Sequence, residues 1–328
     1  MKHIGTLLKL AATIALFWFV FSKVDLAELA SKLTPGQIAV ALFTGVSVLS
    51  LQAVIAAMRL RYCVRLLGRK LKMRDSWVAC QYGGFFSHTP ISFVGGDAMR
   101  IWQMVRIGLP LAESAKAIIV DRALGFFGMM TLVLLSAPVL YSAIKDPHMW
   151  GGYLILLGIG IGVTILFFLL GRLGPMASHR PKALRRIAEI ATVSKYLVGH
   201  PERALKAFIL GLAVTSLNVL AIWVISLGYG NDIGFLTTFA AAPVVFLIAM
   251  VPISVAGWGL REGAFVVAFG LFGVPASLAL TVSITFGIAV LLAYAPAAVL
   301  IVVARRRGVS AARGEEFARG SSPPQRRS

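Results

Sequence analysis

Three pairs of acidic and basic residues lie inside apolar stretches of this sequence, namely Asp97 with Arg100, Asp121 with Arg122, and Arg261 with Glu262. Ionisable side chains in a membrane cost roughly 2.5–3.5 kcal/mol each, so they usually face a protein interior and pair with one another. Arginine also offers a fork of donors that fits a phosphate. Together these pairs predict a site for a zwitterionic or phosphate-bearing group.

Two of the pairs follow segments rich in proline and glycine, TPISFVGGDAMR at 89–100 and VPISVAGWGLREGA at 251–264. Glycine permits tight turns and close approach of the backbone. A helix that begins after such a turn points free N–H groups at its surroundings, which favours an anion. We therefore expect the headgroup site to include Gly95, Gly96, Gly257, Trp258 and Gly259 beside the charged residues.

Arg100 and Arg261 are the expected phosphate partners, with Asp97 and Glu262 orienting them or meeting a cationic headgroup. Each has a structural alternative. Asp97 could cap the following helix, and Arg261 with Glu262 could be a structural pair. Arg100 could share the wet face of an interfacial helix with Gln103 and Arg106.

Asp121 and Arg122 are neighbours about 100° apart on a helix, so we expect them to point in different directions, one pairing internally and the other snorkelling. His88 could carry a proton or be satisfied locally, and Trp258 could line a cavity or fill it. Gln52 and Asn218 are expected to make hydrogen bonds between helices.

The composition indicates an integral membrane protein, because 58% of the 328 residues are apolar and 14% are charged. The net charge of +19 is concentrated between apolar stretches. That distribution is typical of a topology signal rather than of nucleic-acid binding. The two cysteines, Cys63 and Cys80, have no metal-ligand spacing and are expected to be inert thiols.

Six stretches are long enough to cross a bilayer: about 5–22, 36–58, 117–141, 151–171, 207–228 and 278–303. Two further apolar regions, about 76–112 and 235–273, are interrupted by proline and glycine. The segments 59–75, 172–206 and 304–328 carry seven, eight and seven Lys or Arg residues. The positive-inside rule places these segments and both termini in the cytoplasm if the interrupted regions are re-entrant helical hairpins.

The two interrupted regions also resemble each other, since PISFVGG at 90–96 and PISVAGW at 252–258 begin alike. We therefore expect an all-α polytopic membrane protein with six full transmembrane helices and two oppositely oriented re-entrant hairpins. These form one transmembrane domain over 1–304, an inverted repeat of about 5–141 and about 151–303. Residues 305–328 are expected to be a disordered basic cytoplasmic tail. Inverted repeats with paired, broken helices are typical of transporters.

The motifs GGDAMR at 95–100, VDRALG at 120–125 and GWGLREGA at 257–264 resemble the flippase-like transmembrane region of lysylphosphatidylglycerol synthases. The resemblance extends over about 5–303. It implies an inner-membrane protein that moves a phospholipid or related amphiphile between leaflets. It also implies headgroup roles for Gly95, Gly96, Asp97, Arg100, Asp121, Arg122, Gly257, Gly259, Arg261 and Glu262.

The synthases carry a soluble aminoacyl-transfer domain after the membrane region, whereas 25 residues follow the last expected span here. We therefore expect no enzyme activity, no cofactor and no metal. A small-anion transporter and a non-transporting partner of a lipid or glycan biosynthesis complex remain alternatives. No nucleotide-binding motif is present, so Asp97, Asp121, Glu262 and His88 are the candidates for proton coupling. The basic cytoplasmic loops are expected to contact anionic lipid.

Overall fold

The computed structural model describes residues 34–88, 95–173, 194–250, 258–297 and 299, and it is built from α-helices in these parts of the chain. The helices are α3 (Pro35–Leu66), α4 (Met73–His88), α5 (Gly96–Arg106), α6 (Leu111–Ala143), α7 (Pro147–Leu173), α9 (Pro201–Gly228), α10 (Phe235–Ala249), α11 (Leu260–Gly270) and α12 (Ala276–Ala293). Within the described residues, five helices are long and apolar enough to cross a membrane: α3, α6, α7, α9 and α12. The expected helical, multi-pass membrane protein is confirmed at this level. The expected span over 5–22 and the tail over 305–328 lie outside the described residues.

The first described helix, α3, begins where the sequence supplies a complete start signal. Thr34 accepts a hydrogen bond from the Gln37 N–H at 3.3 Å, and the Gln37 side chain accepts one from the Thr34 N–H at 3.0 Å. Pro35 occupies the first helical position, where its missing N–H costs nothing. The helix then runs for 32 residues, or about 48 Å. It therefore continues past the expected end at residue 58 and includes Arg59.

Small residues let the long helices approach closely at the centre of the bundle. A Cβ atom added at Gly228 of α9 would meet the Cα of Ala41 in α3 at 2.5 Å. Gly128 of α6 and Gly211 of α9 face each other in the same way, since a Cβ at Gly128 would meet the Gly211 carbonyl carbon at 2.9 Å. Packing through small residues is how helices associate in a membrane, where burial of apolar surface gives little driving force.

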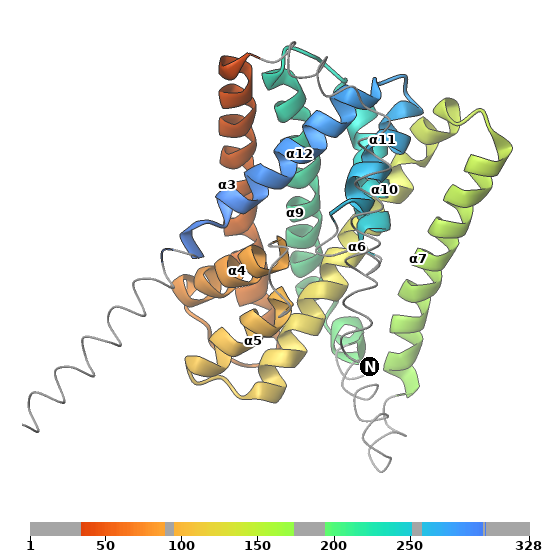
Figure 1. Ribbon diagram of the computed structural model, residues 1–328. Helices are drawn as coiled ribbons and strands as arrows, with labels where there is room; N and C mark the ends of the chain where they lie inside the picture. The colour runs from red at the N-terminus through yellow and green to blue at the C-terminus, as the bar shows by residue number, and fades with distance from the viewer. Residues whose placement is uncertain (1–33, 89–94, 174–193, 251–257, 298, 300–328) are drawn as a thin grey trace, which may run out of the picture.

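Each interrupted region contains two short helices that pack against one another, α4 with α5 and α10 with α11. Figure 1 shows the two pairs toward opposite ends of the bundle. At 11 residues each, α5 and α11 reach about 16 Å, roughly half of a hydrocarbon core. Residues 89–94 and 251–257, which stand between the helices of each pair in the sequence, lie outside the described residues.

The expected last span over 278–303 is interrupted, because α12 ends at Ala293 and a turn follows at Tyr294-Ala295 before helical residues at 296, 297 and 299, while 298 and 300–303 lie outside the described residues. The physical reason is Pro296, since the residue before a proline is disfavoured in helical conformation. Figure 1 shows α12 crossing the bundle obliquely toward α4. The turn places Tyr294 beside α4, where its ring stacks on His88 with the ring centroids 6.2 Å apart.

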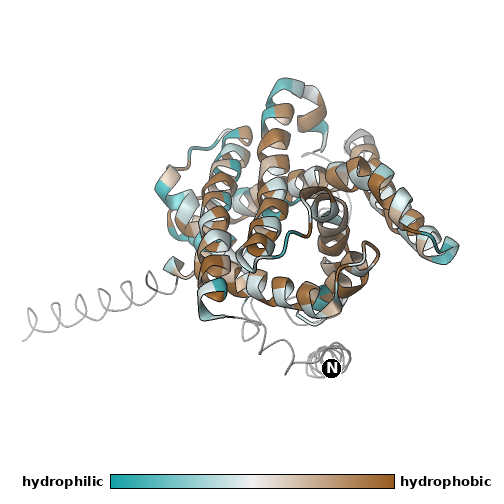
Figure 2. Cartoon of the chain, turned by 90° about the horizontal axis from the view of Figure 1, so that it is seen from above, coloured by the Kyte–Doolittle hydropathy of each residue, from teal (hydrophilic) through white to brown (hydrophobic). Residues whose placement is uncertain are grey.

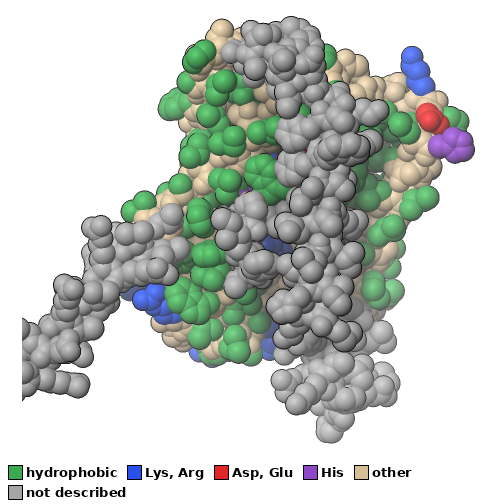
Figure 3. Space-filling model, viewed as in Figure 1, with side chains coloured by type: hydrophobic (Ala, Val, Ile, Leu, Met, Phe, Trp, Pro, Cys, Tyr) green, Lys and Arg blue, Asp and Glu red, His purple; other side chains and the backbone are tan. Residues whose placement is uncertain are grey.

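The outer surface of the bundle is apolar along the helices and charged mainly near their ends. Seen from above, hydrophobic residues dominate the helices, and hydrophilic residues gather at helix ends and turns (Figure 2). In the space-filling view, hydrophobic side chains are prominent on the part of the face that the grey atoms leave open, and most Lys and Arg side chains seen there lie toward its lower end (Figure 3). This is the side on which α4 and α5 lie in Figure 1. The distribution suits a protein embedded in a bilayer.

The α6–α9 crossing gives a direct test of this packing. Substituting Gly211→Val would place a Cβ 2.6 Å from the carbonyl oxygen of Leu124, so α6 and α9 must separate. Overpacking of this kind costs about 1–3 kcal/mol. We expect a lower melting temperature in detergent. Gly162→Val on α7 is the control, because nothing lies within 4 Å of its added Cβ. Equal melting temperatures for the two variants would contradict the close crossing.

Candidate functional site

A cavity of about 430 Å³ lies among the helices, and α3, α4, α5, α6, α9, α10, α11 and α12 contribute to its wall. We call it the central cavity. It reaches the middle of α6 at Phe126, of α9 at Thr215 and of α12 at Phe286. Four arginines line it: Arg59, Arg100, Arg122 and Arg261. Asp121 lines it as well, and the other two predicted acids, Asp97 and Glu262, pair with these arginines.

Asp121 of α6 joins three helices through its carboxylate. Arg59 of α3 donates to both oxygens, from Nε at 2.7 Å and from Nη2 at 3.0 Å. Arg100 of α5 donates from Nη1 at 3.4 Å. Asp121 is 1% exposed and both arginines are buried. A carboxylate so deeply buried persists because it is paired on both oxygens.

Arg122 and Asp97 form the second pair, between α6 and α5. Arg122 donates from Nε at 2.8 Å and from Nη2 at 2.5 Å. Both side chains are partly exposed, at 49% and 39%. Arg100 also lies 3.8 Å from Asp97. Arg100 therefore stands between two carboxylates, and neither contact is a short one.

Arg261 and Glu262 form the third pair, at the start of α11. Arg261 donates to Glu262 at 3.0 Å and 2.5 Å, and the Gly259 N–H donates to the other Glu262 oxygen at 2.6 Å. The Arg261 guanidinium lies over the Trp258 ring, 4.8 Å from its centroid. Gly259 has a φ of +85°, a conformation that favours glycine. Its turn brings the backbone N–H onto the Glu262 carboxylate.

Glycines on neighbouring helices make room for three of the arginines. A Cβ at Gly83 of α4 would collide with the Arg100 side chain, and one at Gly287 of α12 with the Arg261 guanidinium. A Cβ at Gly125 of α6 would lie 3.1 Å from Nη1 of Arg59. The arginines therefore fill the spaces that the missing side chains leave.

The two interrupted regions meet beside the cavity. The Trp258 indole N–H donates to the His88 carbonyl oxygen at 3.2 Å. The His88 Nδ1 lies 2.9 Å from the Gly84 carbonyl oxygen, so in this arrangement Nδ1 carries a proton. The Tyr294 hydroxyl donates to Gln52 at 3.2 Å, a bond between α3 and the end of α12. Gln52 thus makes the interhelical hydrogen bond expected of it.

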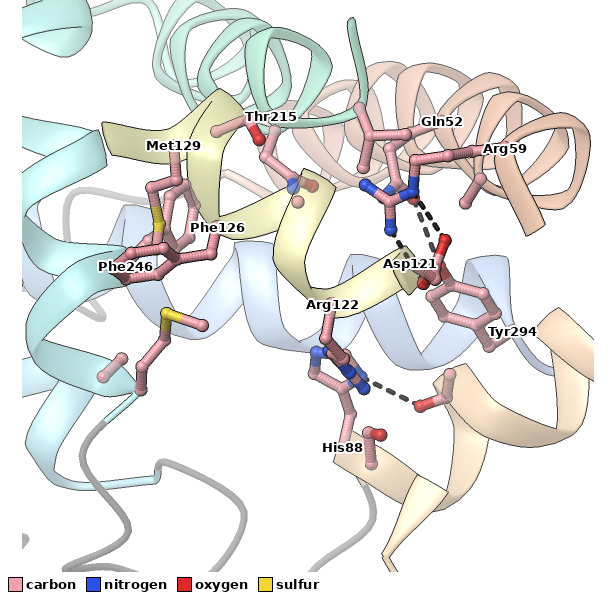
Figure 4. A pocket seen from close by; sticks show the side chains of 18 of the residues that line it. Gln52, Arg59, His88, Asp121, Arg122, Phe126, Met129, Thr215, Phe246 and Tyr294 are labelled. Atoms are coloured by element: carbon pink, nitrogen blue, oxygen red, sulfur yellow. Dashed lines mark hydrogen bonds and ion pairs between the residues drawn. The ribbon is translucent and has the colours of Figure 1, made fainter. Parts of the chain in front are cut away.

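The cavity has a polar and an apolar side. Figure 4 shows Gln52, Arg59, Asp121 and Tyr294 together on one side. On the opposite side lie Phe126 and Met129 of α6 and Phe246 of α10. Arg122 points between them, near His88. A molecule that filled this space would meet charge at one end and hydrocarbon at the other.

The structure brings most of the predicted site residues together. Asp97, Arg100, Asp121 and Arg122 form one network of ion pairs, and the pair of Arg261 and Glu262 lies at the same cavity, with His88, Trp258 and Gly259 beside it. Gly96 packs against the Gly83 carbonyl oxygen, and Gly95 is the N-cap of α5. Gly257 lies outside the described residues.

Two of the structural alternatives are not observed, and the expectation for Asp121 and Arg122 is met in part. Asp97 does not cap α5, because Gly95 holds that position and the Asp97 carboxylate pairs with Arg122. Arg100 and Gln103 are buried and do not form a wet face with Arg106, since α5 packs against α4 and α6. Asp121 pairs internally with Arg59, as expected for one of the two neighbours, whereas Arg122 is half-exposed and pairs with Asp97 at the cavity.

Sequence reasoning missed Arg59, Tyr294 and Gly83, and counted Arg59 among the cations of a cytoplasmic loop. The sequence did contain a sign that Arg59 belongs to the helix rather than to the loop. The helical pattern of the preceding span continues without a break through the alanine-rich segment QAVIAAMRL at 52–60. In the described parts of the chain, no group of three or more His, Cys, Asp or Glu side chains could hold a metal ion. Cys63 and Cys80 are free and buried.

Comparison with protein families identifies the family of this chain. The sequence matches the model of the lysylphosphatidylglycerol synthase transmembrane region over residues 6–299. The chain belongs to this family. A comparison with curated proteins found no match. The lysylphosphatidylglycerol synthase transmembrane region is a membrane domain linked to lipid handling and is separate from any catalytic domain.

The Arg59–Asp121 pair gives a test of the site's architecture. In Arg59→Met, Asp121 stays buried with Arg100 as its remaining partner at 3.4 Å. Breaking a buried pair costs about 3–5 kcal/mol. We expect a lower melting temperature and less folded protein by size-exclusion chromatography. Arg65→Met, an exposed arginine on the same helix, is the matched control.

Adding Asp121→Asn to the Arg59→Met variant should recover part of the lost stability, since a neutral amide replaces the isolated charge. If Arg59→Met were as stable as Arg65→Met, the buried pair would not support the fold.

Proposed function

We propose that this protein translocates a phospholipid or related lipid between the leaflets of the inner membrane. The observation that carries the proposal is the two-sided central cavity. Arginines and polar groups on one side suit a phosphate-bearing headgroup, and Phe126, Met129 and Phe246 on the other suit the start of an acyl chain. A small soluble anion would make no favourable contact with the apolar side of the cavity. Membership of a lipid-handling membrane family supports the same reading.

The helix contacts support an inverted repeat with two re-entrant hairpins. If α3–α6 corresponds to α9–α12, the contact between α3 and α12 has its counterpart in that between α9 and α6. The contact of α5 with α6 likewise matches that of α11 with α12. Alternating access in transporters commonly uses such repeats, with the substrate site at their interface. The central cavity lies at this interface.

Among the four arginines, Arg100 is the best candidate for binding phosphate. Arg59, Arg122 and Arg261 each donate two or more bonds to a carboxylate. Arg100 makes contacts of 3.4 Å and 3.8 Å, and its buried Nε has no hydrogen-bond partner in the described structure. Arg100 can therefore donate hydrogen bonds to a ligand while giving up weaker contacts than the other three arginines would. Arg261 is the second candidate, with Asp97 and Glu262 as orienting groups.

Transport without a nucleotide is downhill or coupled to an ion. Asp97 and His88 are the more accessible candidates for carrying a proton, since Asp97 is 39% exposed and His88 lines the cavity. Asp121 and Glu262 are buried and held by arginines. The chain's own chemistry is thus binding and transport, and we assign it no enzymatic role.

The orientation follows from the basic turn between α3 and α4, which we place in the cytoplasm together with both termini. Arg61, Arg65, Arg69, Lys70 and Lys72 surround a hollow of about 690 Å³ in this turn. Arg69 pairs with Glu113, and Arg61 donates to the Leu71 carbonyl oxygen at 3.1 Å. The remaining cations are positioned to hold the phosphate of an anionic lipid.

Lipid retained by the purified protein tests this basic turn. The double variant Arg65→Gln/Lys72→Gln should lose bound anionic phospholipid, measured by mass spectrometry of lipid extracts. Each cation near a membrane surface contributes about 1 kcal/mol of attraction. Lys145→Gln, in the turn between α6 and α7, should retain the wild-type amount. Equal loss in both variants would refute a specific contact at the basic turn.

Reconstitution into liposomes tests translocation. A fluorescent phosphatidylglycerol should become accessible to a quencher from the opposite leaflet, while soluble phosphate stays trapped. Hydrogen bonds to charged groups contribute about 1.5–3 kcal/mol, so Arg100→Ala should slow the lipid by about tenfold or more. Arg106→Ala, an exposed arginine of the same helix stacked on Trp102, should not.

Two results would favour the alternatives. Leakage of phosphate without lipid movement would indicate a small-anion transporter. Lower abundance of Arg100→Ala with unchanged lipid movement per molecule would indicate a structural residue, as in a non-transporting partner of a lipid or glycan biosynthesis complex.

A further inference from the structure

A second cavity, of about 190 Å³, lies between α6, α7, α10 and α11, and its described lining contains no charged residue. We call it the apolar groove. Its floor is buried and includes Leu140, Tyr153 and Val244. Met149 of α7 and Val267 of α11 lie at its mouth and are 46% and 58% exposed. The groove therefore opens to the surroundings of the bundle.

The chemistry of the groove favours hydrocarbon as its occupant. The side chains of its described lining are apolar except for the Tyr153 hydroxyl, which already donates to the Val133 carbonyl oxygen at 2.9 Å. Apolar cavities of about 150 Å³ stay dry and bind benzene. A whole helix, about 10 Å across, does not fit a space of this volume. A flexible acyl chain does, and lipid surrounds a membrane protein on every side.

Aromatic side chains place the outer end of the groove at the level of the lipid headgroups. The ring centroid of Trp150 lies 5.2 Å from that of Tyr141 and 5.2 Å from that of Tyr153, at the turn from α6 to α7. Trp and Tyr are enriched where a membrane meets water. Figure 1 shows this turn at the end of the bundle opposite to α4 and α5, which in the proposed orientation faces the outer leaflet.

The inner end of the groove lies beside the central cavity. Ala264 of the groove follows Arg261 of the cavity by one helical turn of α11. Ile248 of the groove packs in the same hydrophobic cluster as Met129 of the cavity. Apolar packing is therefore continuous from the apolar side of the central cavity to the groove.

The length of the groove matches the depth of a leaflet. From Ala264 to Leu271, both in its lining, the chain rises about 10 Å along α11. The hydrocarbon of one leaflet is about 15 Å thick, half of a core of about 30 Å. The groove thus covers most of the depth between the headgroup level and the central cavity.

We propose that the apolar groove is an acyl-chain site for a lipid of the outer leaflet, and that a lipid enters or leaves the central cavity from this site. The chain lies along α7 and α11, with its headgroup at the level of Trp150 before or after its stay in the central cavity. The acyl-chain site stands on the groove itself, whereas its part in transport rests on the proposed function.

Gly152 of α7 offers a way to fill the groove while the fold is kept. It lines the groove, and nothing lies within 4 Å of a Cβ added to it. A Cβ added at Gly158 also meets nothing within 4 Å, and Gly158 lies on the same helix outside the lining of the groove. Gly158→Leu is therefore the matched control for Gly152→Leu, and both variants should keep the wild-type melting temperature.

Photocrosslinking measures occupancy of the groove. The protein is reconstituted with phosphatidylglycerol that carries a diazirine on one acyl chain, and the labelled peptides are identified by mass spectrometry. We expect more labelling of 149–156 and 264–271 than of 159–169, the more exposed part of α7. Gly152→Leu should lower the groove labelling by about fivefold or more, since extra volume in an occupied apolar space is unfavourable, and Gly158→Leu should retain it.

Equal labelling of the three segments in the wild type would mean that the groove holds only surrounding lipid, and would overturn the acyl-chain site. Labelling of the groove that is weaker than that of 159–169 would overturn it too, as when another helix covers the groove. The same holds for equal labelling of the groove in Gly152→Leu and Gly158→Leu.

The liposome assay separates the acyl-chain site from transport. Gly152→Leu should slow the movement of fluorescent phosphatidylglycerol by about fivefold or more relative to Gly158→Leu. Equal rates in the two variants would overturn the part of the groove in transport. Specific labelling of the groove in a wild-type protein that moves no lipid would leave the acyl-chain site standing and refute the translocation proposal.

Discussion

The carboxylate of Asp121 is buried among apolar helices and accepts hydrogen bonds from guanidinium groups on two of them. A charge in this position is tolerated while its partners are held in place, since an unpaired buried ion is far more costly than a paired one. The carboxylate therefore fixes α3 and α5 relative to α6. Through Arg100 it is also connected to Asp97, which holds Arg122. The geometry of Arg59, Arg100, Asp97 and Arg122 depends on this one carboxylate.

Space for these ions comes from residues that have no side chain. Arginine is long and protein interiors are closely packed, so each buried guanidinium needs space that the neighbouring helices leave open. Gly83 and Gly287 leave the volume that Arg100 and Arg261 occupy. The short helices α5 and α11 contribute in another way, because they begin beside the cavity and place Arg100 and Arg261 within their first two turns. Broken helices and glycines thus serve the same end, which is to admit charge to the interior.

Much of this organisation could be predicted from the sequence, and the limits have physical causes. Spans and interruptions are local properties of hydropathy, proline and glycine, so α3, α6, α7 and α9 were expected close to their observed places. The acid–base pairs were recognisable because charge is rare in apolar segments. Their partners were not recognisable, because Asp121 pairs with Arg59, 62 residues away, and the unbroken helical pattern that places Arg59 in α3 does not say which acid it meets. The spaces at Gly83 and Gly287 depend on packing between distant helices, which no local pattern encodes.

The distribution of short and long contacts also suggests how binding can be coupled to movement. Arg59, Arg122 and Arg261 are each held at 3.1 Å or less by a carboxylate, so they keep the cavity's shape when a ligand enters. Arg100 is held less closely by two carboxylates that remain paired with other arginines if it turns away. A phosphate can therefore bind Arg100 while Asp97 and Asp121 both keep an arginine partner. In the proposed cycle, that exchange would loosen α5 from α6 at the moment the headgroup binds, and its reversal would restore the contact on release. A residue can move in this way when each of its partners is held more closely by another group, and among the four arginines of the described cavity this is true of Arg100.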